Sequence, residues 1–179
     1  TYTMDKLISM GIDVYIPQDS TKVGKPDLVV YTAAVHPDNV EYAYAAENNI
    51  PLMDRALLLG KIMDEYRYRI AISGAHGKTT TTTLTAYLLE QMGFDATIHD
   101  GGEAPFLNGN VKSGNSDYFI TEACEFNGSF LKLNPYIGVI LNIDFDHVDW
   151  FKTFENMKKS FLEFANRIDK DGYLVACYD

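Results

Sequence analysis

The chain has 179 residues, of which 46% are hydrophobic and 22% are charged, proportions ordinary for a soluble globular protein that can bury one full core or two small lobes. Its formal net charge of −10 argues against a nucleic-acid backbone or an anionic membrane as the main partner, because either would repel the chain. We therefore expect no nucleic-acid and no membrane partner, and an anionic substrate would need a local positive site.

The sequence also suggests a compartment. Cys124 and Cys177 are too few and too far apart in sequence to predict a disulfide framework or a zinc site, so we expect a reducing, cytoplasmic setting. No apolar run approaches the ~20 residues of a membrane helix, and the N-terminus lacks a signal pattern. The chain begins at Thr1 without methionine, in what reads as the middle of a helix, which predicts a fragment.

The first third of the sequence predicts alternating helices and strands. Apolar residues recur at helical spacing over 3–10, 38–48 and 54–66, and short strands are predicted over 13–16, 28–34 and 50–53. Such alternation predicts a parallel sheet with right-handed crossovers. Residues 1–66 therefore read as the later part of a small Rossmann-like lobe, without its first strand and glycine-rich turn.

The pattern continues through residues 67–179, so the predicted fold class is α/β throughout. Strands are predicted over 70–72, 94–98, 117–123, 136–143 and 173–176, with a helix from Lys78 to Met92 and a glycine- and asparagine-rich loop over 100–115. Thr153 is predicted to cap an amphipathic helix that ends near 168. The residues expected on its buried face are Phe154, Met157, Phe161, Leu162 and Phe164.

The most informative stretch is the turn after the 70–72 strand, Ser73-Gly74-Ala75-His76-Gly77-Lys78-Thr79-Thr80. Glycines allow the backbone N–H groups to turn inward, and the helix that follows adds unpaired amides and a positive dipole end, so an anion fits there. Lys78 would neutralise terminal phosphate oxygens, and the Thr79 hydroxyl would hold Mg²⁺. Because Ile72 stands where the general P-loop pattern has its first glycine, an ordinary turn with a solvated lysine stays open.

Two further strands bring polar side chains to the same expected edge of the sheet. Glu122 ends the 117–123 strand, and with Thr79 and nucleotide phosphates it would complete a magnesium shell. A segment dense in metal-capable side chains follows the 136–143 strand; it contains Asn142, Asp144, Asp146, His147 and Asp149. Each of these polar residues could also be a solvated or capping side chain.

Together these motifs resemble the Mur ligase family, whose members add amino acids to the bacterial cell-wall precursor. The family's phosphate loop, G-T-H-G-K-T followed by threonines, is matched by residues 74–80; its glutamate-led segment is matched by 122–131, and its N-I-x-x-D-H-x-D motif by 142–149. The resemblance implies a partial UDP-sugar-binding, Rossmann-like domain at 1–66 and a partial P-loop ATPase domain at 67–179. It also implies that the family's C-terminal ligase domain is absent from this chain.

Within the family, the chain most resembles the branch that joins L-alanine to the carboxylate of UDP-N-acetylmuramate through an acyl phosphate. The resemblance implies these two substrates, ATP and Mg²⁺, and a fragment that is inactive alone. Implied catalytic residues are Lys78 and His147, and implied metal ligands are Thr79, Glu122 and His147. Implied nucleotide-binding residues are Gly74, Ala75, His76, Gly77, Lys78, Thr79, Thr80 and Asn142.

Some positions depart from the family pattern. Ala75 replaces the usual threonine, and Cys124, Phe126 and Asn127 replace a more acidic version of the glutamate-led segment, so only Glu122 is carried over as a ligand. Three alternatives stay open: a murein-peptide recycling ligase, a folylpolyglutamate synthase, and a noncatalytic nucleotide-binding module. The loop at 105–109 favours the cell-wall branch.

Overall fold

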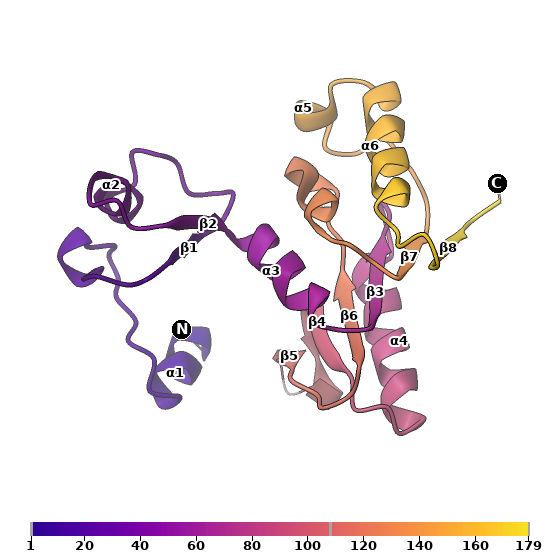
Figure 1. The fold of residues 1–179 in the computed structure, drawn as a ribbon, viewed down its shortest axis with the longest axis horizontal. Helices are drawn as coiled ribbons and strands as arrows, with labels where there is room; N and C mark the ends of the chain where they lie inside the picture. Colours follow the sequence, from indigo (N-terminus) through magenta and orange to yellow (C-terminus); the bar gives the residue numbers. More distant parts are fainter. Residues whose placement is uncertain (1, 108, 179) are drawn as a thin grey trace. The chain divides into compact units, whose positions relative to one another are not determined.

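The computed structural model describes residues 2–107 and 109–178, which divide into two units, Thr1–Arg55 and Ala56–Asp179 (Figure 1). Asn108, part of the 105–109 loop used in the sequence comparison, lies outside the described residues. Both units alternate helices with strands, and their sheets are parallel apart from one strand pair. The predicted α/β class is therefore confirmed.

The first unit is built on a two-stranded parallel sheet. Its elements are α1 (Tyr2–Ser9), η1 (Ser20–Lys22), β1 (Val29–Tyr31), α2 (Val40–Glu47) and β2 (Leu52–Asp54), and Val29 lies opposite Leu52. The side chain of Asn39 accepts hydrogen bonds from the N–H groups of Glu41 and Tyr42, at 3.0 and 3.2 Å. This cap explains why α2 begins at Val40 instead of at residue 38, since the capping residue itself is extended.

The strand predicted over 13–16 does not form. Within the described residues this segment pairs with no strand, and its Tyr15 and Ile16 are 45% and 72% exposed. A strand needs a neighbour that accepts its backbone hydrogen bonds, so a short apolar run without one remains irregular.

The second unit contains a six-stranded sheet in the order β5-β4-β6-β3-β7-β8. All neighbouring strands run parallel except β4 and β5. Its elements are α3 (Arg55–Asp64), β3 (Tyr68–Ser73), α4 (Lys78–Gln91), β4 (Thr97–Ala104), η2 (Pro105–Leu107), β5 (Gly109–Lys112), β6 (Tyr118–Glu122), η3 (Phe126–Lys132), β7 (Ile137–Ile140), α5 (Val148–Phe151), α6 (Phe154–Asn166) and β8 (Tyr173–Ala176).

The sheet separates two apolar clusters. Ile70 and Ile72 of β3 pack with Ala86 of α4 on one face, whereas Ala71 of the same strand packs with a second cluster that contains Phe161 of α6. Alternate residues of a strand point to opposite faces, which is why Ala71 parts from its two neighbours. Burial on both faces explains the continuous apolar run of β3, typical of a central parallel strand.

The helix predicted at 153–168 is confirmed in position and cap. Thr153 Oγ1 accepts a hydrogen bond from the Asn156 N–H at 3.2 Å, and the buried side chains of the helix are Met157, Phe161 and Phe164. The expected burial of Phe154 and Leu162 is wrong, because these are 40% and 63% exposed. Leu162 lies off the stripe formed by residues 157, 161 and 164. Phe154 is the first residue of the helix, about one turn before Met157, where the packed stripe begins.

The strand predicted at 94–98 and the loop predicted at 100–115 are both wrong in their limits. β4 begins at Thr97 and continues to Ala104, and β5 pairs with it antiparallel. Glycines and an aspartate make residues 100–102 poor strand formers, yet β4 pairs with β6 over 97–99 and with β5 at 98, 99 and 104. Tertiary hydrogen bonding has thus overridden the local composition.

Helix α3 packs in the second unit. Met63 is fully buried in the same cluster as Phe119 and Phe130, and a side chain at Gly60 would overlap the Lys132 carbonyl. The division into units accordingly falls before Ala56, whereas the sequence predicts a domain boundary after residue 66. None of the helices in residues 2–107 and 109–178 is long and apolar enough to span a membrane.

Candidate functional site

The three sequence motifs meet at the carboxyl edge of the central strands. β3 lies between β6 and β7 and runs parallel to both, with Ile72 opposite Glu122 and Ser73 opposite Ile140. Parallel strands end at the same edge, where open α/β sheets bind their ligands. The phosphate loop, the glutamate-led segment and the 142–149 segment therefore adjoin one another.

The loop after β3 needs both of its glycines. Gly74 has a φ of 142°, and a Cβ there would lie 3.0 Å from the Leu141 Cβ. Gly77 has a φ of 83° and precedes α4 as its N-cap residue, without a side-chain cap. The first N–H groups of α4 are consequently left for another acceptor, as in an anion-binding helix start.

Asn142 holds the loop through backbone atoms. Its Oδ1 accepts a hydrogen bond from the His76 N–H at 2.9 Å, and its Nδ2 donates to the His76 carbonyl at 3.0 Å. The Ala75 N–H donates to the Asn142 carbonyl at 3.2 Å. The His76 ring is exposed, with its Nε2 3.4 Å from Asp144 Oδ2. His76 thus takes its place in the loop through its peptide groups.

Glu125 is a site residue that sequence reasoning did not single out. Its side chain is 1% exposed, and its Oε2 and Oε1 lie 3.0 and 3.2 Å from the Lys78 Nζ. Lys78 also donates to the carbonyls of Gly74 at 2.6 Å and Ala75 at 3.2 Å. A buried carboxylate requires such a partner, so this ion pair fixes the lysine of the loop. The only sequence signal was its place within the glutamate-led segment.

His147 adjoins the same carboxylate. Its Nε2 lies 3.6 Å from Glu125 Oε1, and its ring centroid is 5.0 Å from that of Phe126. The residue has a φ of 50° and precedes α5. Asp146 Oδ1 accepts the His147 N–H at 2.6 Å, and this bond, followed by the charge of His147, lowers the pKa of Asp146. Asp146 therefore supports the backbone at His147.

Thr79 and Glu122, two of the predicted metal ligands, are in contact: the Thr79 hydroxyl donates to Glu122 Oε2 at 2.7 Å. Within residues 2–107 and 109–178, no three His, Cys, Asp or Glu side chains are grouped to hold a metal. A cation here would accordingly take hydroxyl and phosphate oxygens beside Glu122. The predicted third ligand, His147, lies against Glu125 and Phe126, so its metal role stays a prediction.

The threonine run of α4 has a structural explanation. Thr85 Oγ1 donates to the Thr81 carbonyl at 2.8 Å, whereas Thr83 Oγ1 lies 2.8 Å from the Thr79 carbonyl and 2.5 Å from Asp100 Oδ2, so its single proton serves one of two acceptors. Hydroxyls that bond back to the preceding turn satisfy themselves within the helix. Thr80, a predicted nucleotide-binding residue, is exposed in the first turn, where its N–H has no acceptor within the helix.

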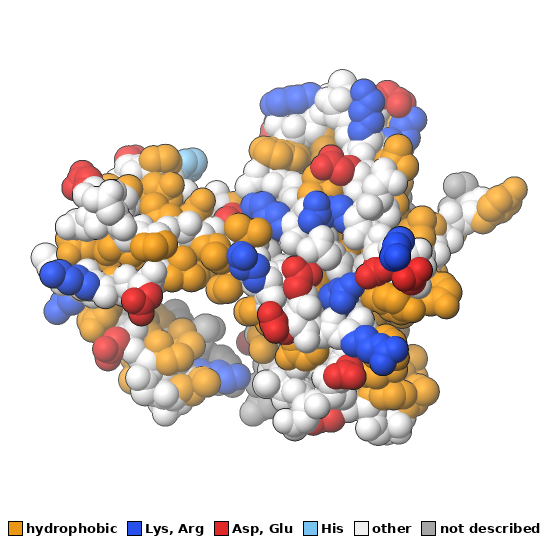
Figure 2. Space-filling model, in the orientation of Figure 1, with side chains coloured by type: hydrophobic (Ala, Val, Ile, Leu, Met, Phe, Trp, Pro, Cys, Tyr) orange, Lys and Arg blue, Asp and Glu red, His pale blue; other side chains and the backbone are white. Residues whose placement is uncertain are grey.

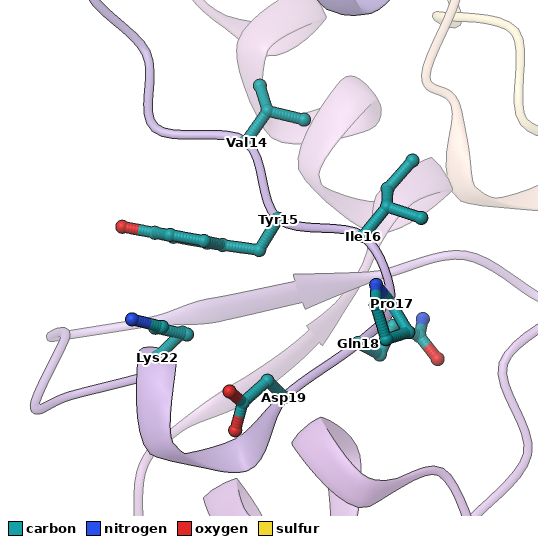
Figure 3. A pocket seen from close by; sticks show the side chains of 7 residues that line it. All are labelled: Val14, Tyr15, Ile16, Pro17, Gln18, Asp19 and Lys22. Carbon is teal, nitrogen blue, oxygen red and sulfur yellow. The ribbon is translucent and has the colours of Figure 1, made fainter.

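Two hollows lie outside the loop itself. One, of about 510 Å³, borders Asn142 and is lined by Ile140, Asn142, Ile143, Phe154, Lys158, Ala176 and Cys177. The other, of about 340 Å³, lies in the first unit between Tyr15, Asp19 and Lys22 (Figure 3). There the Lys22 Nζ is 5.4 Å from the Tyr15 ring centroid, and Thr21 hydrogen bonds lower the pKa of Asp19. Both charged side chains of this hollow thus have contacts within the first unit.

Charge is mixed on the visible surface. On the face drawn in Figure 2, acidic and basic side chains are interspersed, and no broad basic area appears there. At the phosphate loop, the positive groups are Lys78 and the start of α4.

Comparison with known proteins agrees with this arrangement. Residues 72–179 match the model of the Mur ligase middle domain, and residues 1–67 match the model described as Mur ligase family, catalytic domain. The chain belongs to the Mur ligase family. The resemblance stated from three short motifs is thus confirmed.

Two curated relatives that share one name are similar to this chain along nearly its whole length. A UDP-N-acetylmuramate–L-alanine ligase of Caldanaerobacter subterraneus subsp. tengcongensis is 50% identical over 179 residues, which cover 100% of this chain and 39% of the relative. The ligase of that name from Clostridium tetani is 52% identical over 174 residues, which cover 97% of this chain and 38% of the relative. The chain therefore spans about two fifths of the length of these curated relatives.

A solved structure agrees with the fold of this Mur ligase chain. The UDP-N-acetylmuramate-alanine ligase of Thermotoga maritima superposes with a TM-score of 0.88 at 26% identity, over 98% of this chain and 41% of that one. The match covers both units and the sheet edge where the three motifs lie.

Proposed function

We propose that this chain is part of an ATP-dependent ligase that joins L-alanine to the carboxylate of UDP-N-acetylmuramate in peptidoglycan precursor synthesis. The observation that carries the proposal is the 50% identity, along all 179 residues, to a relative named for that reaction. The site supports it, since a phosphate loop, a carboxylate and a histidine share one sheet edge.

In the proposed reaction, a carboxylate oxygen of UDP-N-acetylmuramate attacks the γ-phosphorus of ATP, and the bond to ADP breaks. The amine of L-alanine then attacks the acyl carbon, and phosphate leaves with its bonding electrons while the amine loses a proton. Both steps require charge neutralisation and positioning more than a side-chain nucleophile.

The proposed roles follow from contacts in the second unit. Lys78, held by Glu125, stabilises the negative charge of the transferring phosphoryl group. The amides at the start of α4 bind phosphate oxygens, and Asn142 keeps the loop in shape. His147 orients the substrate carboxylate from its place beside Glu125.

The residues fit a magnesium ion bound together with nucleotide. Thr79 and Glu122 present oxygen atoms 2.7 Å apart next to the loop, and Mg²⁺ is commonly held by one or two carboxylates, a hydroxyl and substrate phosphates. When bound, the ion supplies positive charge that offsets the charge developing on the phosphates.

The proposal includes the domain arrangement predicted from sequence: residues 1–66 as part of a UDP-sugar-binding domain and 67–179 as part of the ATPase domain. It also places the protein in the cytoplasm, consistent with the free thiols of Cys124 and Cys177. Because relatives are more than twice as long, we propose that this chain alone binds ATP but forms little or no product.

Calorimetry and a product assay test the proposal. We expect the chain to bind ATP with Mg²⁺ and to bind UDP-N-acetylmuramate in preference to a folate, which would exclude the folylpolyglutamate synthase alternative. Folate binding without UDP-sugar binding would overturn the substrate assignment. Robust formation of UDP-N-acetylmuramoyl-L-alanine by the 179 residues would show that the remaining length of the relatives is dispensable.

A further inference from the structure

Asp100 of β4 is a buried carboxylate with one oxygen unaccounted for. The residue is 1% exposed, and its Oδ2 lies 2.5 Å from the Thr83 hydroxyl. Its Oδ1 is buried and has no hydrogen-bond partner among the described residues. An orphaned carboxylate oxygen is costly, and such groups in folded proteins are generally satisfied by a partner, water or an ion.

The pairing of β4 with β6 places Asp100 beside the candidate cation site. Ile98 lies opposite Ile120 and His99 lies opposite Thr121, and Asp100 and Glu122 are the residues that directly follow this last pair. Ile98 and Ile120 belong to the cluster on the α4 face, and side chains two residues on point to the same face. Asp100 and Glu122 therefore both project toward α4.

The backbone after Asp100 confirms this proximity. A Cβ on Gly101 would overlap the Glu122 carboxylate, and a Cβ on Gly102 would lie 2.9 Å from Thr79 Cγ2. The Glu122 carboxylate thus lies directly over the residue that follows Asp100. Only glycine allows this approach of β4 to the site.

Four oxygen-bearing side chains meet here, two from the sheet and two from α4. Thr79 pairs with Glu122, and Thr83, one helical turn later, pairs with Asp100. Within the described residues, no ion pair joins either carboxylate to a basic side chain, and the nearby Lys78 pairs with Glu125 instead. Two neighbouring carboxylates without a basic partner favour a cation.

We infer that Asp100 belongs to the cation site. Thr79 and Glu122 are the direct protein ligands, and the free Oδ1 of Asp100 accepts hydrogen bonds from the water that a divalent ion such as Mg²⁺ retains. Thr83 fixes the other oxygen of Asp100 and so acts as a positioning residue. The inference rests on the proposed function, because the ion is bound together with nucleotide phosphates.

The test uses Mn²⁺ as a spectroscopic probe and the 179-residue chain. Free Mn²⁺ is counted by electron paramagnetic resonance in the presence of ATP, for the wild type, Asp100→Asn and Thr83→Val. We expect roughly 10-fold weaker Mn²⁺ binding in Asp100→Asn, an effect typical of mutating a residue that hydrogen-bonds to a metal's ligands, and a smaller loss of affinity in Thr83→Val. In EDTA, Asp100→Asn should bind ATP at least as well as the wild type, because a negative charge near the phosphates is removed.

Asp117→Asn is the matched control, since Asp117 is exposed just before β6, at the opposite end of that strand from Glu122. Equal Mn²⁺ affinity in Asp100→Asn, Thr83→Val and Asp117→Asn would overturn the role of Asp100 and leave the proposed function standing. Failure of the wild type to bind ATP with or without Mn²⁺ would overturn both. Circular dichroism checks the fold, and if Asp100→Asn does not fold, Thr83→Val decides.

Discussion

The Lys78 ammonium group lies between both oxygens of Glu125, at 3.0 and 3.2 Å, although the two residues are 47 positions apart in sequence. One belongs to the phosphate loop and the other to the segment after β6. Their ion pair fixes the direction of the long, flexible Lys78 side chain. The pair is shielded from solvent, since Glu125 is 1% exposed. The lysine side chain is therefore already ordered, and in the proposed function less of its entropy would remain to be lost on phosphate binding.

Glu125→Gln should destabilise the second unit. Breaking a buried ion pair costs about 3–5 kcal/mol, but Lys78 keeps two carbonyl acceptors and glutamine can still accept a hydrogen bond. We therefore expect a loss of roughly 1–3 kcal/mol in the free energy of unfolding, measured by urea titration. The control Glu155→Gln removes an exposed pair with Lys158 and should change it by less than about 0.5 kcal/mol. Equal urea midpoints for both variants would contradict the buried pair.

Lys78→Ala should remove most ATP affinity, by at least about 10-fold, because one charge-assisted contact to the phosphates is lost. Calorimetry measures the effect, with Lys159→Ala on the exposed side of α6 as the control. Lys78→Ala also leaves Glu125 buried without its partner, so lost affinity could reflect lost folding. The double variant Lys78→Met, Glu125→Gln avoids this charge, and unchanged ATP affinity in it would remove Lys78 from the site.

Glu122→Gln should raise the Mg²⁺ concentration needed for ATP binding. The amide retains the shape and can accept from Thr79, but it lacks the charge that attracts the ion. We expect the half-saturating Mg²⁺ concentration to rise by roughly 10-fold, and fluorescence titration at fixed ATP measures it. Glu103→Gln, exposed on β4, controls for net charge. Superimposable titrations of the two variants would exclude Glu122 as a ligand.

Acid should weaken a second ion pair in the same unit. The Lys112 ammonium, 2.9 Å from Asp95, and hydrogen bonds from Asn115 lower the pKa of Asp95 from 3.8 to about 2. A carboxyl group with a lowered pKa in the folded state stabilises the fold above its unfolded value and loses this contribution as the pH falls through its folded value. The stability advantage of wild type over Asp95→Asn should therefore be constant above about pH 5 and shrink toward pH 2.

Urea midpoints measured across this range test the prediction. Asp171→Asn is the control, because Asp171 lies 3.9 Å from Lys170 in an exposed pair. The pH dependence of Asp95→Asn is compared with that of this variant. A gap between wild type and Asp95→Asn that is equally large at pH 2 and pH 6 would contradict the role of the Asp95 carboxylate.

The elements that sequence predicted well have strong local signals. Thr153 and the apolar stripe of α6 define that helix, and the apolar run before Ser73 defines β3. β4 could not be predicted in the same way, because Asp100, Gly101 and Gly102 disfavour strands. The strand is held by pairs on either side of them, at 97–99 with β6 and at 98, 99 and 104 with β5. Residues 13–16 show the converse, a strand-like run without a partner.

The residues of the candidate site differ in the same way, since some have a local sequence signal and others do not. Gly74, Gly77 and Lys78 carry a motif that can be read in order, and Glu122 stands at the end of a clear strand. Glu125 and Asp100 carry no periodic or motif signal of their own. Their significance depends on burial and on contacts with Lys78 and Thr83, which only the folded chain defines.

The two hydrogen bonds between the Asn142 side chain and the peptide groups of His76 reproduce the pairing of one strand residue with another. In this respect the loop continues the sheet, because the Asn142 side chain joins it to the segment that follows β7. A displacement of the loop must therefore carry the start of the 142–149 segment with it. In the proposed function, nucleotide would bind at Lys78 and the substrate carboxylate at His147, on two segments joined by these hydrogen bonds. Neither segment could then be repositioned without the other.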